Sequence, residues 1–66
     1  MSPVQFTHLI DYERFGRNRD GDWEALPLFV YCFNLEDAKA RYEVMEQDKL
    51  NMMIGIVELP EPYVRS

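Results

Sequence analysis

The chain has 66 residues, of which 47% are hydrophobic and 14% aromatic, and its formal net charge is −5 from 12 acidic and 7 basic side chains. A chain of this length forms one domain and buries only about 60% of the surface that its unfolded form exposes, so its core alone provides little stability. The acidity argues against a dedicated nucleic-acid-binding protein, whose affinity comes from Lys and Arg side chains that neutralise phosphates. The hydrophobic content argues against disorder.

The cysteine content and the length of the apolar runs exclude further classes. Cys32 is the only cysteine, which excludes a disulfide within the chain, and its place in an apolar run predicts a small buried side chain. No apolar run approaches the about 20 residues of a membrane-spanning helix. The first residues lack the basic start and apolar core of a targeting segment. We therefore expect a cytoplasmic protein with no membrane partner.

Two strands are expected in the first half of the chain. Residues 4–13 alternate with a period of two, which is typical of a strand with one buried face. That face would carry Val4, Phe6, His8, Ile10 and Tyr12. Residues 15–22, with Asp20-Gly21, predict a hairpin loop. Residues 23–33 form the second strand, and Pro27, which cannot donate a ladder hydrogen bond, predicts that this strand lies at an edge of the sheet.

A helix is expected directly after the second strand. Asn34 is a favourable N-cap residue, and Asp37, three residues further on, resembles a reciprocal cap. Apolar side chains then recur at helical spacing and predict the buried stripe. This stripe consists of Leu35, Ala38, Tyr42 and Met45.

Residues 52–59 predict the third strand. Gly55 indicates a bulge within it or a close approach of another backbone, and Pro60 and Pro62 are expected to end it. The tail, residues 61–66, is expected to be extended and weakly held. The whole chain, residues 1–66, is therefore predicted to be a single α+β domain of strand-strand-helix-strand order, with one helix packed on one face of a three-stranded sheet. The strand-helix-strand crossover makes the second and third strands parallel, and the first fits between them, giving the sheet order 2-1-3.

Few residues could carry catalysis or hold a metal. His8 is the only histidine, and a structural zinc site needs about four His or Cys ligands. We therefore expect no catalytic residue, no metal site and no cofactor. Arg14, Arg17 and Arg19 near Trp23 could hold a single nucleic-acid strand by charge and stacking. Acidic side chains occupy the same segment, so direct nucleic-acid binding is not expected.

Surplus apolar surface is the strongest functional signal. The second and third strands are apolar on both faces, although one helix covers only one face, and exposed apolar patches mark association sites. The alternative is that the tail, through Tyr63 and Val64, folds over the open face. The acidic outer side of the helix is a second candidate, suited to a basic partner surface, although a solvated face is the commoner explanation. The predicted partner-binding residues are Trp23, Phe29, Tyr31, Phe33, Glu36, Asp37, Glu43 and Glu46.

Two segments carry a resemblance to a known group of proteins. The apolar strand that leads into Asn34-Leu-Glu-Asp-Ala38, followed after the helix by Ile54-Gly-Ile-Val-Glu-Leu59, is similar to small phage-encoded inhibitors of strand-strand-helix-strand build. These include certain anti-CRISPR proteins and phage inhibitors of bacterial RNA polymerase. They share a format and no motif, so no functional residue is carried over.

The resemblance implies a non-enzymatic protein that blocks a host nucleic-acid machine by occupying its surface, in the cytoplasm of a bacterial host. Two alternatives stay open. The first is a small homodimeric accessory or regulatory subunit whose open sheet faces pair. The second is a small enzyme whose active site forms around His8 across a dimer.

Overall fold

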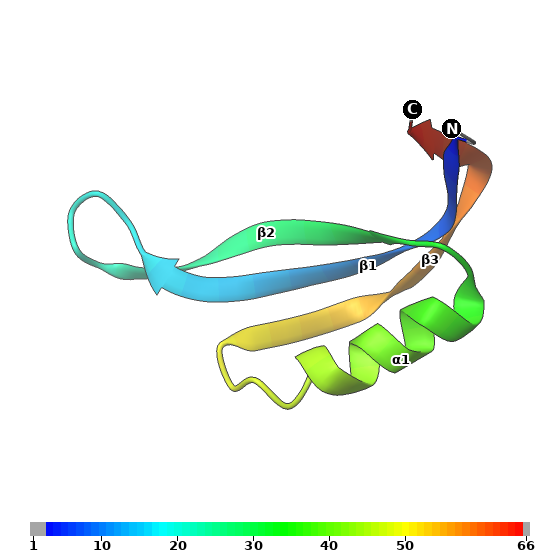
Figure 1. Cartoon of the computed structure of the whole chain (residues 1–66). Coiled ribbons are helices and arrows are strands. Elements are labelled where there is room, and N and C mark those ends of the chain that lie inside the picture. Colours follow the sequence, from blue (N-terminus) through cyan, green and yellow to red (C-terminus); the bar gives the residue numbers. More distant parts are fainter. Residues whose placement is uncertain (1–2, 66) are drawn as a thin grey trace.

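The computed structural model describes residues 3–65. Met1, Ser2 and Ser66 lie outside the described residues. The first two belong to the segment that is expected to lack a targeting signal. The elements are β1 (Val4–Arg17), β2 (Trp23–Cys32), α1 (Leu35–Met45) and β3 (Asn51–Arg65). They form an α+β fold in β-β-α-β order, with a sheet of order β2-β1-β3 and α1 on one face (Figure 1). Because β1 is antiparallel to both neighbours, β2 and β3 run parallel. The predicted fold class, sheet order and edge position of β2 are confirmed.

The β1–β2 hairpin is longer than expected. Residues 15–17 were predicted to be in the loop, but they pair with residues 23–25 of β2, because ladder hydrogen bonds outweigh the weak strand preference of Gly16. The true loop is residues 18–22. There the side-chain oxygen of Asn18 accepts hydrogen bonds from two backbone amides, and Gly21 adopts a φ of 83°. This two-stranded end projects beyond α1 and the start of β3 (Figure 1).

The predicted end of the third strand was wrong. β3 continues past both prolines to Arg65, and its last residues pair with the start of β1. The register shifts between two cross-strand pairs, Phe6–Tyr63 and His8–Glu58. Residues 59–62 therefore bulge opposite a single residue of β1, and a bulge tolerates Pro60 and Pro62 because its residues need not donate to the ladder. A second shift beside Gly55 confirms the bulge predicted there.

Helix α1 begins as the sequence predicts. Asn34 has an extended backbone, and its side-chain oxygen accepts a hydrogen bond from the amide of Asp37 at 2.8 Å. The carboxylate of Asp37 reciprocates by accepting from the amide of Phe33 at 2.9 Å, one residue earlier than in the usual capping box. At the other end, the side chain of Asn51 donates to the carbonyl of Met45 at 3.0 Å, which ties the helix end to the start of β3.

The core under α1 is very small. Within residues 3–65 only Ile10, Cys32 and Ala38 are buried hydrophobic residues, and the partly buried side chains packed against them are Tyr12, Val30, Tyr42, Met45, Met53 and Ile56. Three members of the predicted helical stripe are thus confirmed, whereas Leu35, the first residue of α1, is 44% exposed. No helix in residues 3–65 is long and apolar enough to cross a membrane.

Candidate protein-binding surface

Five aromatic side chains gather on the face of the sheet opposite α1. The aromatic cluster consists of Phe6, Phe29, Tyr31, Phe33 and Tyr63. The rings of Tyr31 and Tyr63 stack with centroids 4.4 Å apart and planes 5° from parallel. Phe6 stacks on Phe33 at 5.1 Å, and Phe29 meets Tyr31 edge-on at 5.3 Å. Such ring pairs hold one another in place, so the cluster is a preformed surface.

Much of this cluster is accessible to solvent. Phe29 is 56% exposed and Phe33 is 47% exposed, which is unusual for large apolar rings. Beside them lies a hollow of about 420 Å³, lined by Tyr31 and Tyr63 together with Leu59, Pro60, Glu61 and Pro62 of the β3 bulge. An exposed aromatic platform beside a hollow is the kind of surface that anchors a partner side chain.

Each member of the cluster is positioned by a different feature of the sequence. Phe29 and Tyr31 point away from α1 because they alternate along β2 with Val30 and Cys32, which pack toward the helix. The backbone of Phe33 is held at both ends, since its amide donates to Asp37 and its carbonyl accepts from the Thr7 hydroxyl at 3.0 Å.

Phe6 and Tyr63 were missed from the sequence. Strict alternation places Phe6 with Ile10 under the helix, but the bulge opposite Thr7 interrupts the alternation and Phe6 stacks in the aromatic cluster instead. Tyr63 was assigned to a weakly held tail, whereas pairing with Phe6 brings it onto Tyr31. The alternative, in which the tail covers the open face, holds only in part, because Tyr63 packs on the cluster while Val64 and Phe29 stay exposed.

Two carboxylates flank the aromatic cluster. Asp11 lies directly opposite Phe29 in the β1–β2 register, on the same face of the sheet. Glu61 forms part of the hollow beside Tyr63. Neither carboxylate forms an ion pair among residues 3–65. The cluster thus combines apolar contact area with negative charge that is free to meet a basic group.

The other predicted site residues lie elsewhere. Glu36 and Glu43 are exposed on α1 and Glu46 is exposed at its C-cap, on the far side of the sheet from the aromatic cluster. Trp23 lies at the opposite end of β2 from Tyr31, about 27 Å away at 3.4 Å per residue, with the guanidinium of Arg17 over its ring at 5.4 Å. The structure therefore brings together only Phe29, Tyr31 and Phe33 of the predicted set.

Asp37 has a structural task. Its two carboxylate oxygens accept hydrogen bonds from the amide of Phe33 and from Nε of Arg41, the latter at 3.0 Å. The hydrogen bond from Phe33, with a further contribution from Arg41, lowers the pKa of Asp37 below its ordinary value. With both oxygens engaged, Asp37 holds Phe33 against the helix start and is less available to a partner than the free carboxylates.

The arginines near the hairpin tip are partly committed within the chain. Arg14 donates to Asp48 at 2.9 Å and to the side chain of Asn51 at 2.8 Å, and Arg17 covers Trp23. The hydrogen bond from the Leu50 amide and the contact with Arg14 lower the pKa of Asp48. This leaves Arg19 as the remaining arginine of the tip, which provides little charge for a phosphate backbone.

His8 is flanked by Cys32 and Glu58 in the sheet register, so three side chains with catalytic chemistry meet on one face. Cys32 is completely buried. Its burial and, to a smaller extent, the nearby Asp37 carboxylate raise the pKa of its thiol, whereas the charge of Arg41 acts in the opposite direction. A buried thiol with a raised pKa is a poor nucleophile. Nδ1 of His8 is itself hydrogen-bonded to the Thr7 hydroxyl at 2.7 Å. Cys32 and Nδ1 of His8 are thus both engaged within the fold.

Residues 3–65 contain no group of three or more His, Cys, Asp or Glu side chains placed to hold a metal ion. Comparisons of the chain with protein-family models, with curated proteins and with solved structures find no match.

Proposed function

We propose that this chain is a non-enzymatic protein-binding inhibitor that acts by occupying a basic surface of its partner. The observation that carries the proposal is the exposed aromatic cluster flanked by Asp11 and Glu61. Aromatic rings supply the anchor of an interface, and uncompensated carboxylates select a partner with Lys or Arg at the matching positions.

The class of partner follows from charge. Proteins that handle nucleic acids present strongly basic channels, because their affinity comes from neutralising phosphates. A chain with net charge −5 is attracted to such channels over long range, and the exposed Glu36, Glu43 and Glu46 add to this field. A bacterial RNA polymerase and a CRISPR effector are the two machines proposed, in keeping with the phage-type format of the sequence.

The test uses the full chain in transcription by purified bacterial RNA polymerase and in DNA cleavage by purified CRISPR effectors. We expect inhibition of one of them, weakening as salt is raised. Phe29→Ser should weaken inhibition at least about tenfold, since Phe29 is the most exposed ring of the cluster and an aromatic hot-spot residue typically contributes about 2 kcal/mol or more.

Ile54→Ser is the matched control. Ile54 is 60% exposed, close to the 56% of Phe29, but it lies on β3 outside the aromatic cluster. Its replacement should leave inhibition unchanged. The proposal is wrong if the chain inhibits neither machine and if no protein from a bacterial lysate is retained by the natural chain and lost by Phe29→Ser.

A further inference from the structure

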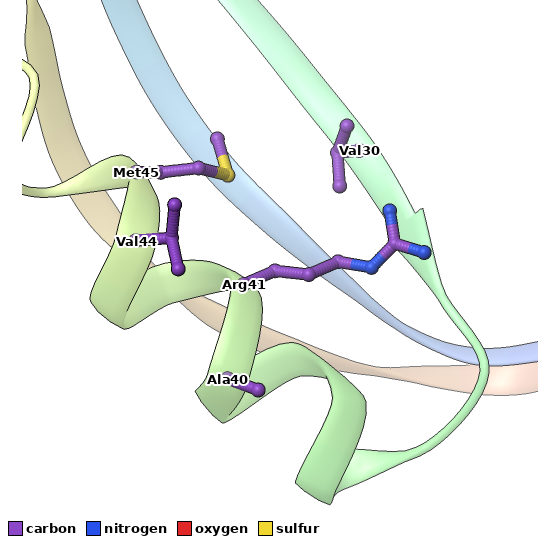
Figure 2. Close-up of a pocket in the computed structure, with 5 residues that line it drawn as sticks. All are labelled: Val30, Ala40, Arg41, Val44 and Met45. Atoms are coloured by element: carbon purple, nitrogen blue, oxygen red, sulfur yellow. The ribbon is translucent and has the colours of Figure 1, made fainter.

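A second apolar surface lies on the other side of the sheet, between α1 and β2. A groove of about 380 Å³ is lined by Val30, Ala40, Arg41, Val44 and Met45 (Figure 2). Leu26 and Leu28 alternate in step with Val30, so they extend this apolar face toward the hairpin, and both are exposed. The β2–α1 surface is defined as Leu26, Leu28, Val30, Ala40 and Val44.

The groove exists because one helix is too narrow for three strands. Ala38, Tyr42 and Met45 of α1 belong to the core cluster with residues of all three strands, but β2 contributes only Val30 and Cys32, from its last part. A helix about 10 Å across covers about two strands spaced 4.8 Å apart, which leaves the earlier part of β2, with Leu26 and Leu28, exposed. The side chain of Arg41 spans the groove, with its guanidinium beside Val30 (Figure 2).

The molecule exposes more surface than a compact domain of the same mass. The chain exposes 5292 Å², whereas a folded monomer of 7.9 kDa exposes about 4,400 Å². Its radius of gyration is 13.8 Å, against about 11 Å for a compact domain of 66 residues. The excess of about 900 Å² is spread over an elongated molecule, which includes the projecting hairpin, and it is as large as the about 800 Å² that each partner buries in a standard protein interface.

We propose that a second copy of this chain covers the β2–α1 surface, forming a homodimer about a two-fold axis. The charge of the surface selects this occupant. The five residues of the surface are uncharged, and Arg41, the one charged residue that lines the groove, already pairs with Asp37, so the lining itself holds no unpaired charge for a basic partner. Apolar surfaces of this kind are typical of homodimer interfaces, in which the same patch meets itself.

The small core supports the same conclusion. A chain with three fully buried hydrophobic residues among its described residues depends on further burial to stay folded. A second copy is present wherever the chain is made, so it can supply that burial during folding. Pro27 lacks an amide hydrogen and interrupts edge pairing along β2, so the contact is made by side chains of the β2–α1 surface. This dimer uses the face opposite the aromatic cluster and is independent of the inhibitor function.

The test begins with the unmodified full chain. Sedimentation or light scattering should give twice the 7.9 kDa of one chain, and the Tm should rise with protein concentration, as it does when association accompanies folding. Val44→Glu should raise the dissociation constant at least about tenfold, because a carboxylate would be buried without a partner. Val44 is 69% exposed in the single chain, so Glu is solvated there and suits the helix.

Leu28→Lys, in the part of the β2–α1 surface that lies on β2, should act in the same direction. Ile54→Glu and Phe29→Ser lie outside the surface and should leave the dimer intact, which separates this proposal from the inhibitor function. Because Val44→Glu could lose its fold together with its partner, the concentration dependence of the unmodified chain decides between one chain and two. A single-chain mass with a Tm independent of concentration would overturn the proposal, as would a dimer unaffected by both substitutions.

Discussion

The face of the sheet under α1 buries Ile10, Cys32 and Ala38 completely, whereas the opposite face leaves Phe29 and Phe33 about half exposed. Both faces carry mainly apolar side chains along β2. The difference therefore comes from where the single helix lies and not from the hydrophobicity of the strands. In a domain this small, apolar residues beyond the reach of the helix form surfaces, and such surfaces are available for association.

The largest expected effect on stability is at the centre of the face that α1 covers. Ile10→Ala should lower the free energy of unfolding by about 3 kcal/mol, because it removes a completely buried side chain and leaves a cavity. That loss is a large share of the stability of a domain of this size. Urea unfolding followed by circular dichroism measures it.

Leu9→Ala is the matched control, since Leu9 precedes Ile10 on β1, faces the other side of the sheet and is only partly buried. Its loss should be clearly smaller. Equal losses at the two positions would mean that the open face is as well packed as the covered one, and the comparison would fail.

Contacts on the face opposite α1 stabilise the fold less than the buried core does, by an amount that is still measurable. Tyr63→Ala should destabilise the fold by about 1 kcal/mol, because it removes the ring stacked on Tyr31 at 4.4 Å. Val64→Ala, which removes an exposed side chain next to it, should have little effect. If Tyr63→Ala were neutral in equilibrium unfolding, the end of β3 would be held as weakly as the sequence suggested.

The connection from β2 to α1 is stabilised by the N-cap of the helix. Asn34→Ala should cost about 1 kcal/mol, since it removes the acceptor for the Asp37 amide at 2.8 Å. Asn34→Asp keeps an oxygen at the same position and should retain most of the stability. A thermal unfolding series of the natural chain and the two variants checks this order, which would be contradicted by equal Tm values for the Ala and Asp variants.

The smallest expected effect is a dependence on pH. The hydrogen bond from the Phe33 amide, followed by the contact with Arg41, lowers the pKa of Asp37. Because the folded-state pKa lies below the unfolded value of about 3.9, this carboxylate stabilises the fold fully above about pH 4, and the stabilisation is lost as pH falls through the lower folded-state pKa.

The measurement compares the Tm of the natural chain with that of Asp37→Asn from pH 6 to pH 2. The difference between them should stay constant between pH 6 and pH 5 and shrink below about pH 4. Asp48, whose pKa is also lowered, titrates in both proteins and cancels in the comparison. A difference that is the same at pH 2 as at pH 6 would show that the charge of Asp37 does not support the helix start.

Most of the fold could be predicted from local patterns. The alternation of residues 4–13, the edge signal of Pro27 and the Asn34 cap each depend on a few neighbouring residues, and all three led to the correct elements and sheet order. The errors fall where pairing with another strand decides the outcome. Residues 15–17 and the end of β3 are strands because β2 and β1 hold them, although their own sequences contain glycine and proline.

The candidate site was predictable only in part, for the same reason. Phe29, Tyr31 and Phe33 were found because alternation along β2 is a local property. Phe6 and Tyr63 join them through a bulge opposite Thr7, and Pro60 and Pro62, which fit either a bulge or the end of a strand, do not show that the strand continues beyond them. Trp23 and the helix glutamates were grouped with these rings by composition, which does not show on which side of a sheet a residue lies.

The sequence by itself determined the elements, their order, the small core and the surplus of apolar surface, because periodicity, capping and composition act over a few residues. The tertiary structure alone decided which apolar residues α1 covers, which rings gather into the aromatic cluster and where the groove beside β2 opens. These depend on the lateral position of one helix and on the register of β1 against β3. Both are set by contacts between residues far apart in the chain, and a local sequence pattern carries no information about such contacts.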